Sequence, residues 1–583
     1  MLLRAQVPDD GFFTQTGFKG AFSYEGACDA ESTFWLAGLS YAAENGMTAN
    51  TGASSCQELC GDLTVDTYLY AANGPFVLTC QVFVTTSLWI EAGTTIYSLS
   101  ASEAVAMGNA DAAPALIIEP GATITASGTS SDPITFTSNV ANPGTAAGLW
   151  GGLIIMGDAS VYGGTDEVEG ITGYYYGGSD DDDNSGTLSY VRVWHGGAVI
   201  GADNEINGIT FAGVGSGTTV EYCEVAFNLD DGFEWFGGTV NAKYLSVLFA
   251  GDDALDTDLG FTGKIQFAYV MVGSAGNHGT EMDSKWDGTP RSYPQLYSAT
   301  FIGHMNHVVG SVSTDDTAAA ILRFREGTAG EFGNIVVYNS GTAGVKNNDC
   351  AASSDDGAGA GAISATQDSS AIGADVLFFS SNNVIYGNGD LFDIDSSCEV
   401  SGVWTSSVAD GATAVTSDPS LVDMPYDADT DTAYFDPRPS SDSSKLYEDV
   451  DDVPSDGFFE QTLYKGAFPH KDFYDPDARR RLASTVGSNG YWLADLSYAA
   501  EMGMTESLNG LEVDDTYYNG ECDADSCIEL CGDLELPTYL YKNDGTSYII
   551  TCQVFVSEYL YIEAGVTIYA LSAAQAVSLG HPD

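Results

Sequence analysis

Carboxylate side chains recur at matching positions of three short segments, residues 222–238, 244–260 and 267–283. Moving the first segment by 22 positions puts Asp230 and Asp231 on Asp252 and Asp253. If these segments are stacked strands, equivalent side chains lie about 4.8 Å apart. Carboxylates that close raise one another's pKa unless a cation separates them, and oxygen ligands of this kind suit Ca²⁺. The sequence therefore predicts a calcium site built from Asp230, Asp231, Asp252, Asp253, Asp256, Asp258 and Glu281.

Two other roles stay open for these carboxylates. They can accept backbone N–H groups at turns and face water, or they can take part in catalysis. The residue types alone do not separate the three roles.

The spacing of the segments indicates which elements hold these side chains. The 22-residue shift also puts Tyr222 on Tyr244 and Gly238 on Gly260, and a shift of 23 puts Tyr244 on Phe267. Alternating apolar residues within each segment are typical of a half-buried strand. A strand that returns every 22 or 23 residues is too closely spaced for βαβ units, and it favours a β-solenoid in which each coil stacks on the last.

The charge balance restricts the partners. The chain of 583 residues has 18 Lys and Arg against 82 Asp and Glu, a formal net charge of −64. Such a field repels nucleic acid and anionic membranes and favours cations. No apolar run of 18 or more residues predicts a membrane span. Residues 1–10 lack the apolar core of a signal peptide, so we expect a removed signal or a longer chain.

The cysteines predict an oxidising compartment. Cys56, Cys60 and Cys80 have counterparts near the C-terminus with almost the same spacing. Disulfides are favoured over zinc, because no CxxC or His pair accompanies these cysteines. The cysteines expected in disulfides are Cys28, Cys56, Cys60, Cys80, Cys350, Cys398, Cys522, Cys527, Cys531 and Cys552. Cys223 lies in an apolar strand pattern and is expected to be a buried thiol.

A long internal repeat sets the predicted domains. Residues 453–468 repeat residues 7–22, residues 491–504 repeat the helical pattern at 34–47, and the strand pattern after residue 67 returns after residue 538. Cys56–Cys60 is expected to form one helical turn, and Ser98–Met107 a short helix or loop. We predict an N-terminal module (1–64), a β-helix (65–426), an acidic linker (427–452), and a second module with the start of another β-helix (453–583).

Several sequence runs resemble a known family. LWGGLIIMGDA, DDNSGTLSYVRVWHGG and the run from NEINGITFAG to NAKYL are similar to right-handed parallel β-helix proteins of the pectin-lyase-like type, found in bacterial secreted and cell-surface proteins. The resemblance covers roughly residues 65–470 and implies the fold more than an activity. It implies that the DGFF…GAF element follows a β-helix, whereas here that element stands on both sides of one. The predicted fold is therefore all-β, a right-handed parallel β-helix flanked by two homologous disulfide-bearing modules.

An enzyme is one alternative that the resemblance leaves open. Polygalacturonase-like β-helix hydrolases use Asp, His and basic residues on neighbouring coils, and Asp252, Asp253 and His278 are the candidates here. Lys264, Lys285 and Arg291 are the basic residues nearby in the sequence. No Arg-Ile-Lys element follows His278, and so negative a chain suits a polyanionic substrate poorly. No catalytic activity is the prediction.

The function predicted first is structural. The chain is expected to be a subunit of an extracellular filament or surface appendage that joins copies of itself head to tail through its end modules. The alternatives are a polysaccharide-degrading β-helix enzyme and a monomeric calcium-dependent surface adhesin. Calcium is the expected cofactor, and polysaccharide or other surface proteins are further expected partners.

Overall fold

The computed structural model describes residues 56–303 and 320–348 with short gaps (110–111, 141–142, 170, 202–203, 274–275, 286–288 and 340–342), then 364–365, 376–394 (without 388–389), 418–423, 435–470 and 492–498, and five strands beyond residue 526. The helix predicted at 34–47, together with Cys28, Cys350, Cys398 and Cys522, lies outside the described residues. The chain divides into two compact units, residues 1–468 with 495–505, and residues 469–494 with 506–583.

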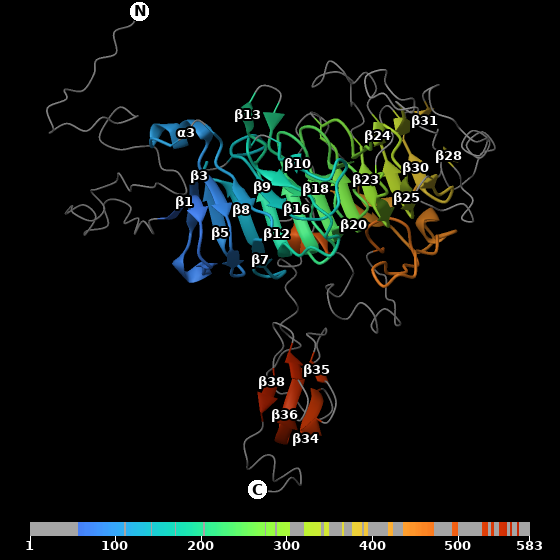
Figure 1. Cartoon of the computed structure of the whole chain (residues 1–583). Helices are drawn as coiled ribbons and strands as arrows, with labels where there is room; N and C mark the ends of the chain where they lie inside the picture. Colours follow the sequence, from blue (N-terminus) through green and yellow to red (C-terminus); the bar gives the residue numbers. More distant parts are fainter. Residues whose placement is uncertain are drawn as a thin grey trace, which may run out of the picture. The chain divides into compact units, whose positions relative to one another are not determined.

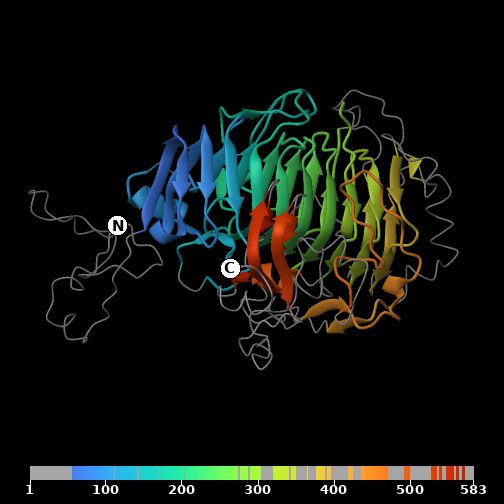
Figure 2. The ribbon, with the colours of Figure 1, turned by 90° about the horizontal axis from the view of Figure 1, so that it is seen from below.

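The first unit is a parallel β-helix whose strands stack coil upon coil in three columns (Figures 1 and 2). Each strand pairs in parallel with its equivalent in the next coil, as in β16 with β18 and β18 with β20. Within one coil the chain passes through the first, the second and then the third column. The predicted parallel β-helix is therefore confirmed.

The elements of the three columns are as follows. The first column contains β2 (Thr67–Leu69), β4 (Ser87–Ile90), β7 (Thr123–Ser127), β22 (Gln295–Tyr297), β25 (Gly330–Gly333), β28 (Ser364–Ala365) and β29 (Val376–Phe379). The second contains β5 (Thr95–Ser98), β8 (Ile134–Ser138), β23 (Thr300–Ile302), β26 (Val336–Tyr338) and β30 (Val384–Tyr386). Four long strands run through both, β12 (Gly186–Trp194), β16 (Thr219–Ala226), β18 (Asn241–Leu248) and β20 (Lys264–Met271). The third contains β6 (Leu116–Ile118), β9 (Leu153–Met156), β15 (Ile209–Ala212), β17 (Phe233–Phe236), β19 (Leu255–Asp258), β21 (Thr280–Met282), β24 (Ala320–Phe324), β27 (Ala343–Asn347) and β31 (Asp390–Ile394). Two long strands, β1 (Gln57–Leu63) and β3 (Phe76–Val84), run through both the second and the third column.

Apolar side chains of all three columns fill the interior of the β-helix. Alternate residues of a strand point to opposite sides, so every second residue enters this core. Trp235 is fully buried there, and its ring lies 5.8 Å from that of Phe211 and 5.5 Å from that of Phe261. Cys223 is a free, buried thiol, as predicted, and burial raises its pKa to about 12.

The bend between the first and second columns is made by aromatic residues in the left-handed backbone region. Tyr190, Tyr222, Tyr244 and Phe267 have φ between 50° and 61°. Their rings stack along the β-helix with centroids 4.4, 4.3 and 4.9 Å apart. Because positive φ is unfavourable for residues other than glycine, this contact with the coils on either side compensates for the strain.

The first strand corrects one prediction. Residues 57–63 form strand β1, so the helical turn expected for Cys56–Cys60 is wrong. Residues four positions apart, such as Cys56 and Cys60, lie on one face of a strand as well as on one face of a helix. The parallel pairing with β3 stabilises the strand here. Cys60 and Cys80 form a disulfide between these two strands, and Cys56 is disulfide-bonded too.

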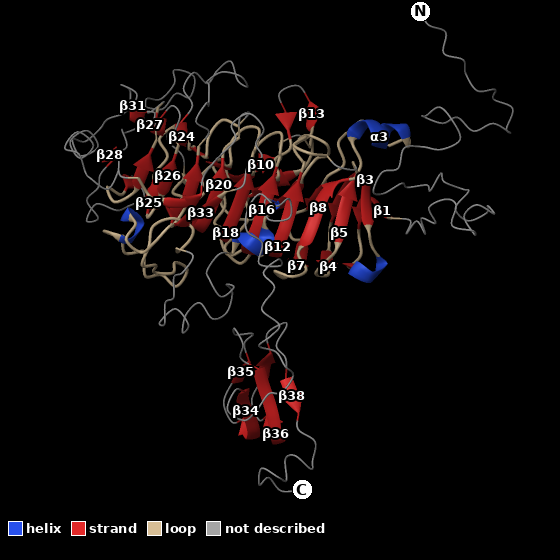
Figure 3. Ribbon diagram, turned by 180° about the vertical axis from the view of Figure 1, so that it is seen from behind, coloured by secondary structure: helices blue, strands red, loops and turns tan. Residues whose placement is uncertain are grey.

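Short elements lie outside the columns (Figure 3). Of the short helix or loop expected at Ser98–Met107, the structure has the helix, α3 (Ala101–Ala106), and Ser100 and Glu103 form its capping box. The others are β10 (Asp166–Glu167) with β11 (Tyr175–Tyr176), β13 (Val199–Gly201) with β14 (Asn204–Glu205), β32 (Leu421–Asp423) with β33 (Asp436–Pro439), the 3₁₀ turns η1 (Ala71–Asn73) and η3 (Lys445–Tyr447), and helix α5 (Leu493–Leu496). Among the described helices none is long and apolar enough to cross a membrane.

The second unit contains two small parallel sheets. They are β34 (Cys527–Leu534) with β36 (Ser547–Val556) and β38 (Ile568–Ala570), and β35 (Thr538–Leu540) with β37 (Leu560–Ile562). The pairing of β34 with β36 shifts register between Leu530 and Gly532, and that of β1 with β3 shifts between Leu59 and Gly61. Leu530 follows Leu59 by 471 residues, and Gly532 follows Gly61 by the same number. This unit therefore repeats the opening of the β-helix in its backbone pairing as well as in its sequence.

Candidate cation-binding site

The outer side of the third column carries three of the seven predicted carboxylates, Asp256, Asp258 and Glu281. Strand pairing places Glu234 beside Asp256, Asp256 beside Glu281, and Glu281 beside Arg323 of β24. These four residues, which we call the outer row, alternate with core residues of their strands and therefore point away from the interior. The outer row is a line of three carboxylates, one from each of three coils, that ends in an arginine.

A second line, the edge row, follows the outer row two residues further along each strand. It contains Asp258, Asp283 and Arg325. The backbone N–H groups of Asp283 and Arg325 donate to the coils before them, at Thr257 and Met282, which fixes this order. The edge row repeats the pattern of the outer row, with carboxylates first and an arginine last.

A third line, the turn row, precedes the strands and contains Asn207, Asp231, Asp253 and His278. Asp231 Oδ1 accepts the backbone N–H of Asp253 at 2.9 Å, and Asp253 Oδ1 accepts the backbone N–H of His278 at 2.6 Å. Asp253 Oδ1 also lies 2.8 Å from His278 Nδ1. Asp231 and Asp253 therefore join neighbouring coils, the turn-capping role that the sequence left open.

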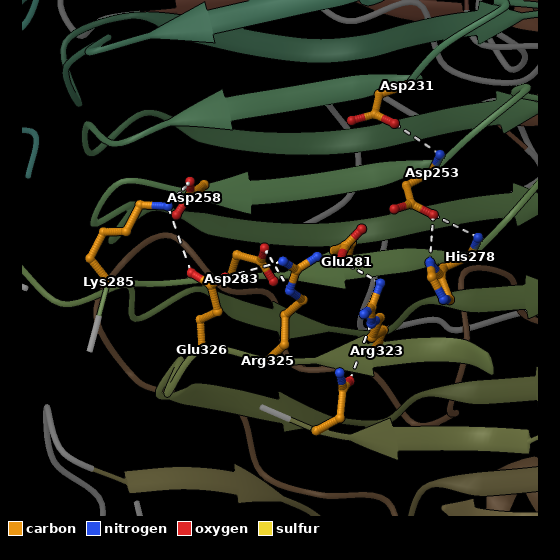
Figure 4. Close-up of polar contacts among 11 residues, drawn as sticks. Asp231, Asp253, Asp258, His278, Glu281, Asp283, Lys285, Arg323, Arg325 and Glu326 are labelled. Atoms are coloured by element: carbon orange, nitrogen blue, oxygen red, sulfur yellow. Dashed lines mark hydrogen bonds and ion pairs between the residues drawn. The ribbon is translucent and has the colours of Figure 1, made fainter. Parts of the chain in front are cut away.

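Cations neutralise the end of the site that lies towards β24 (Figure 4). Glu281 Oε1 lies 2.8 Å from Arg323 Nη1 and 2.5 Å from Arg325 Nη1, and Arg325 Nε lies 3.2 Å from Asp283. Lys285 Nζ lies 3.1 Å from Asp258 Oδ2. Burial acts to raise the pKa of Glu281, but a hydrogen bond from Asp253 and the charges of His278 and the two arginines outweigh it and lower that pKa to about 2.

The opposite end has no such cations among the described contacts. The carboxylate oxygens of Asp231, Glu234 and Asp256 all lie within 4.8 Å of one another. Asp231 and Glu234 are each only 7 % exposed. Burial first, and then the neighbouring carboxylates, raise the pKa of all three groups well above their ordinary values. Three acidic groups in this arrangement can ionise together only if a cation joins them.

Asn207 adds a neutral oxygen beside this group. Its side-chain nitrogen donates to Glu234 Oε2, while its Oδ1 is buried and accepts no hydrogen bond from a described residue. Asp256 Oδ1 is likewise buried without a hydrogen bond in the described part of the chain. Carboxylate and amide oxygens are the ligands that Ca²⁺ prefers. The residues present therefore fit calcium at the end of the site away from β24.

Two further groups of oxygens contain predicted residues. Asp230, Asp231 and Asp252 bring oxygens within 4.8 Å of one another, as do Asp253, His278 and Glu281. Asp230 and Asp252 are partly buried. The second of these groups already contains a histidine and borders the arginines, so its negative charge is compensated.

Two of the catalytic candidates, Asp253 and His278, are in contact, but the basic residues considered with them do not all gather there. Lys264 lies in the first column and pairs with Asp456 at 2.6 Å, away from the acidic rows. His278 is 1 % exposed and is held by Asp253 through its ring and its backbone. Lys285 joins the edge row through Asp258, whereas Arg291 precedes β22 outside the three rows.

Four residues of the site were not predicted from the sequence: Asn207, Glu234, Arg323 and Arg325. Glu234 falls on Asp256 under the same 22-residue shift that revealed the other acidic pairs, so the repeat contained the signal. The arginines had no such signal, because residues 304–319 interrupt the period before β24. Their place beside Glu281 follows only from the pairing of β21 with β24.

Comparison with known families agrees with the fold. The family described as a pectate-lyase-like β-helix domain matches residues 61–374, more than half of the chain. The chain belongs to this family. No curated protein and no solved structure matches it. The pectate-lyase-like domain includes all three acidic rows, so the candidate site lies on the family's β-helix rather than on an added segment.

Proposed function

We propose that this pectate-lyase-like chain is a calcium-binding structural protein of the cell exterior. The observation that carries the proposal is the group formed by Asp231 of the turn row with Glu234 and Asp256 of the outer row, with Asn207 beside it. When bound, Ca²⁺ would neutralise carboxylates contributed by neighbouring coils. Its binding would therefore stiffen the β-helix along its axis.

Proton binding is the competing way to hold these carboxylates together. A protonated carboxyl is neutral, but its single O–H donates a hydrogen bond to only one neighbouring oxygen. One Ca²⁺, in contrast, binds six to eight oxygens. The net charge of −64 gives the whole molecule a potential that concentrates divalent cations at its surface. Both considerations favour the metal at neutral pH.

Calcium titration calorimetry tests this proposal with matched variants. Glu234→Gln and Asp256→Asn each remove one charge from the site, and we expect each to weaken calcium binding by about ten-fold or more. Asp66→Asn removes the same charge from an exposed position between β1 and β2 and serves as the control. Equal calcium binding by all four proteins would overturn the proposal.

A calcium-dependent adhesin follows from the same site. Ca²⁺ bound there would reduce the negative charge of the acidic face, which otherwise repels an anionic polysaccharide. Binding of the protein to an immobilised uronic-acid polymer is then expected with calcium and not with EDTA. Degradation of that polymer is not expected, because Asp253 and His278 bond to each other inside the wall of the β-helix.

Head-to-tail assembly is a second candidate function, favoured by a different observation. Residues 453–468 and 496–498 lie against the outer sides of the first and second columns, and the sequence holds a second copy of both segments near its start. One copy of such a segment binds the β-helix of its own chain, and the second copy can bind the β-helix of another chain, which would join the two chains. Negative-stain electron microscopy with and without a reducing agent tests the assembly, and single short rods at high concentration would contradict it.

A further inference from the structure

Two segments after the β-helix hold its first and second columns, and we call them the clasp: residues 453–468 and 496–498. In the first segment, Asp456 pairs with Lys264 of β20 at 2.6 Å, and Glu460 pairs with Lys243 of β18 at 2.6 Å. The backbone of Glu460 also exchanges two hydrogen bonds with the side chain of Gln266, 2.7 and 2.8 Å long. The clasp thus binds neighbouring coils through ion pairs and through hydrogen bonds of its backbone.

Two aromatic side chains anchor the same segment. The ring of Phe458 lies 4.9 Å from Lys243 Nζ, a cation–π contact, and the ring of Phe459 lies 5.0 Å from that of Tyr297. Strand pairing places Lys243, Gln266 and Tyr297 in one outward line of the first column. The clasp therefore follows a line of equivalent positions from coil to coil.

The segment then returns over the second column. Gly466 N–H donates to Asn334 at 2.8 Å, and Ala467 N–H donates to Thr300 Oγ1 at 2.9 Å. Gly466 has φ of +88°, and a Cβ there would lie 2.6 Å from Thr300 Oγ1, so this position requires glycine. Phe468 ends the segment with its ring 5.4 Å from that of Tyr269.

The second segment of the clasp binds further along the second column. Arg192 Nε donates to the carbonyl of Leu496 at 2.6 Å, and Glu224 accepts the N–H of Tyr498 at 2.6 Å. The ring of Tyr498 meets those of Trp194 and Phe227 edge-on, each with centroids 5.1 Å apart. Arg192 and Glu224 are paired neighbours in the column, so this segment also bridges coils.

Nearly every contacting residue of the clasp occurs a second time. Residues 7–22 differ from 453–468 only at Ser455, Glu460, Leu463 and Tyr464, where the first copy has Asp9, Thr14, Gly17 and Phe18. The ion-pairing aspartate, both aromatic anchors and the required glycine recur as Asp10, Phe12, Phe13 and Gly20. Leu496, Ser497 and Tyr498 recur as Leu39, Ser40 and Tyr41. The first copy therefore has the chemistry to occupy the same surface.

The connection between the two segments is shorter in the first copy but still sufficient. Sixteen residues separate Phe22 from Leu39, against 27 between Phe468 and Leu496. Their docking positions, on β20 and β12, are three coils apart, which is roughly 14 Å at the spacing of paired strands. Sixteen extended residues reach roughly 50 Å. The length of the first copy is therefore compatible with the same docking.

We propose that residues 7–41 dock on the first and second columns of a second copy of this chain, in exchange for that copy's own clasp. This inference rests on the head-to-tail assembly suggested above and identifies the surface that makes it. Thr14 replaces Glu460 and so lacks the ion pair with Lys243. The chain's own clasp is also tethered at high effective concentration. Exchange is therefore a minority event in dilute solution and grows with protein concentration.

Isotope-mixed cross-linking tests the exchange on the full chain. Equal amounts of ¹⁴N- and ¹⁵N-labelled protein are combined at high concentration and treated with a carbodiimide, which joins a lysine to a carboxylate in contact with it. The intact clasp gives links between Lys264 and Asp456 within one chain. The exchange predicts additional links between Lys264 and Asp10 that join a light chain to a heavy one.

Matched variants sharpen the outcome. Glu460→Thr gives the chain's own clasp the residue of the first copy, and it is expected to raise the ratio of Lys264–Asp10 to Lys264–Asp456 links by about five-fold. Phe12→Ala with Phe13→Ala should abolish the Asp10 links and leave those of Asp456 intact. Oligomers without any Lys264–Asp10 link would overturn the exchange while leaving assembly standing. The absence of both oligomers and these links would overturn both.

Discussion

Asp231 accepts the backbone N–H of Asp253, its counterpart one coil further on, at 2.9 Å, and Asp253 does the same for His278. The turn row therefore has a structural task that is independent of any metal. An acidic residue can serve this task while its second oxygen takes part in cation binding. The two roles are separable by substitution, because an amide keeps one acceptor oxygen and loses the charge.

Replacing Asp253 by alanine is expected to destabilise the β-helix strongly. The variant removes the acceptor of the buried N–H of His278 and the contact between Asp253 and the imidazole, at a cost of about 2–4 kcal/mol in the free energy of unfolding. Asp253→Asn keeps an acceptor oxygen and is expected to cost clearly less. Denaturant unfolding of both variants checks this, and equal losses would show that the charge rather than the acceptor matters.

The pH dependence of stability is expected to contain a contribution from Glu224. This buried carboxylate accepts hydrogen bonds from Tyr498, Ser246 and Trp194, yet burial raises its pKa to about 7, from 4.5. Because the pKa is higher in the folded state, this group's stabilisation is fully present below pH 4.5 and is lost as pH rises to about 7. The loss is about 3 kcal/mol at most.

Glu224→Gln removes that titration and is the test. Relative to the natural chain, the variant should gain stability above pH 7 and gain little at pH 4.5. Unfolding curves recorded between pH 4 and 8 measure the difference. A difference that does not change with pH would contradict the assignment.

Lys465 in the clasp is expected to be a stabilising position for substitution. Its side chain is fully buried, its Nζ has no hydrogen-bond partner among the described residues, and burial lowers its pKa. Lys465→Met keeps the aliphatic stem and removes the buried charge, so a gain of about 1–3 kcal/mol is expected at pH 7. The gain should shrink as the pH rises towards 10.5, where the natural lysine loses its proton in both states.

Lys445, which is far less buried, supplies the control for that comparison. It pairs with Glu448 at 2.5 Å, and the two side chains are 42 % and 54 % exposed. Lys445→Met should therefore change stability by less than about 1 kcal/mol. Similar gains from both substitutions would point to a general effect of net charge rather than to burial.

The sequence alone predicted the β-helix and part of its acidic site, for one physical reason. A solenoid repeats its side chains at a nearly constant interval, so a single shift of 22 related Asp230 and Asp231 to Asp252 and Asp253. Arg323 and Arg325 were missed because a long segment breaks the interval before β24. Lys264 was grouped with the acidic residues because the period does not say which of three columns a residue faces.

The position of the clasp could not be predicted from the sequence either. The sequence revealed that residues 7–22 and 453–468 are copies, but not where either copy lies. Contacts such as Asp456 with Lys264 join residues 192 positions apart, and no local pattern encodes them.

The measurement that tests the central claim most directly is thermal unfolding of the natural chain and of Glu234→Gln, each after EDTA treatment and then with millimolar CaCl2. A ligand that binds only the folded state at one hundred times its Kd stabilises that state by about 2.7 kcal/mol. We predict that calcium raises the unfolding temperature of the natural chain by several degrees and that Glu234→Gln loses most of this rise. No calcium effect on the natural chain, or an equal effect on both proteins, would contradict a calcium site at Asp231, Glu234 and Asp256.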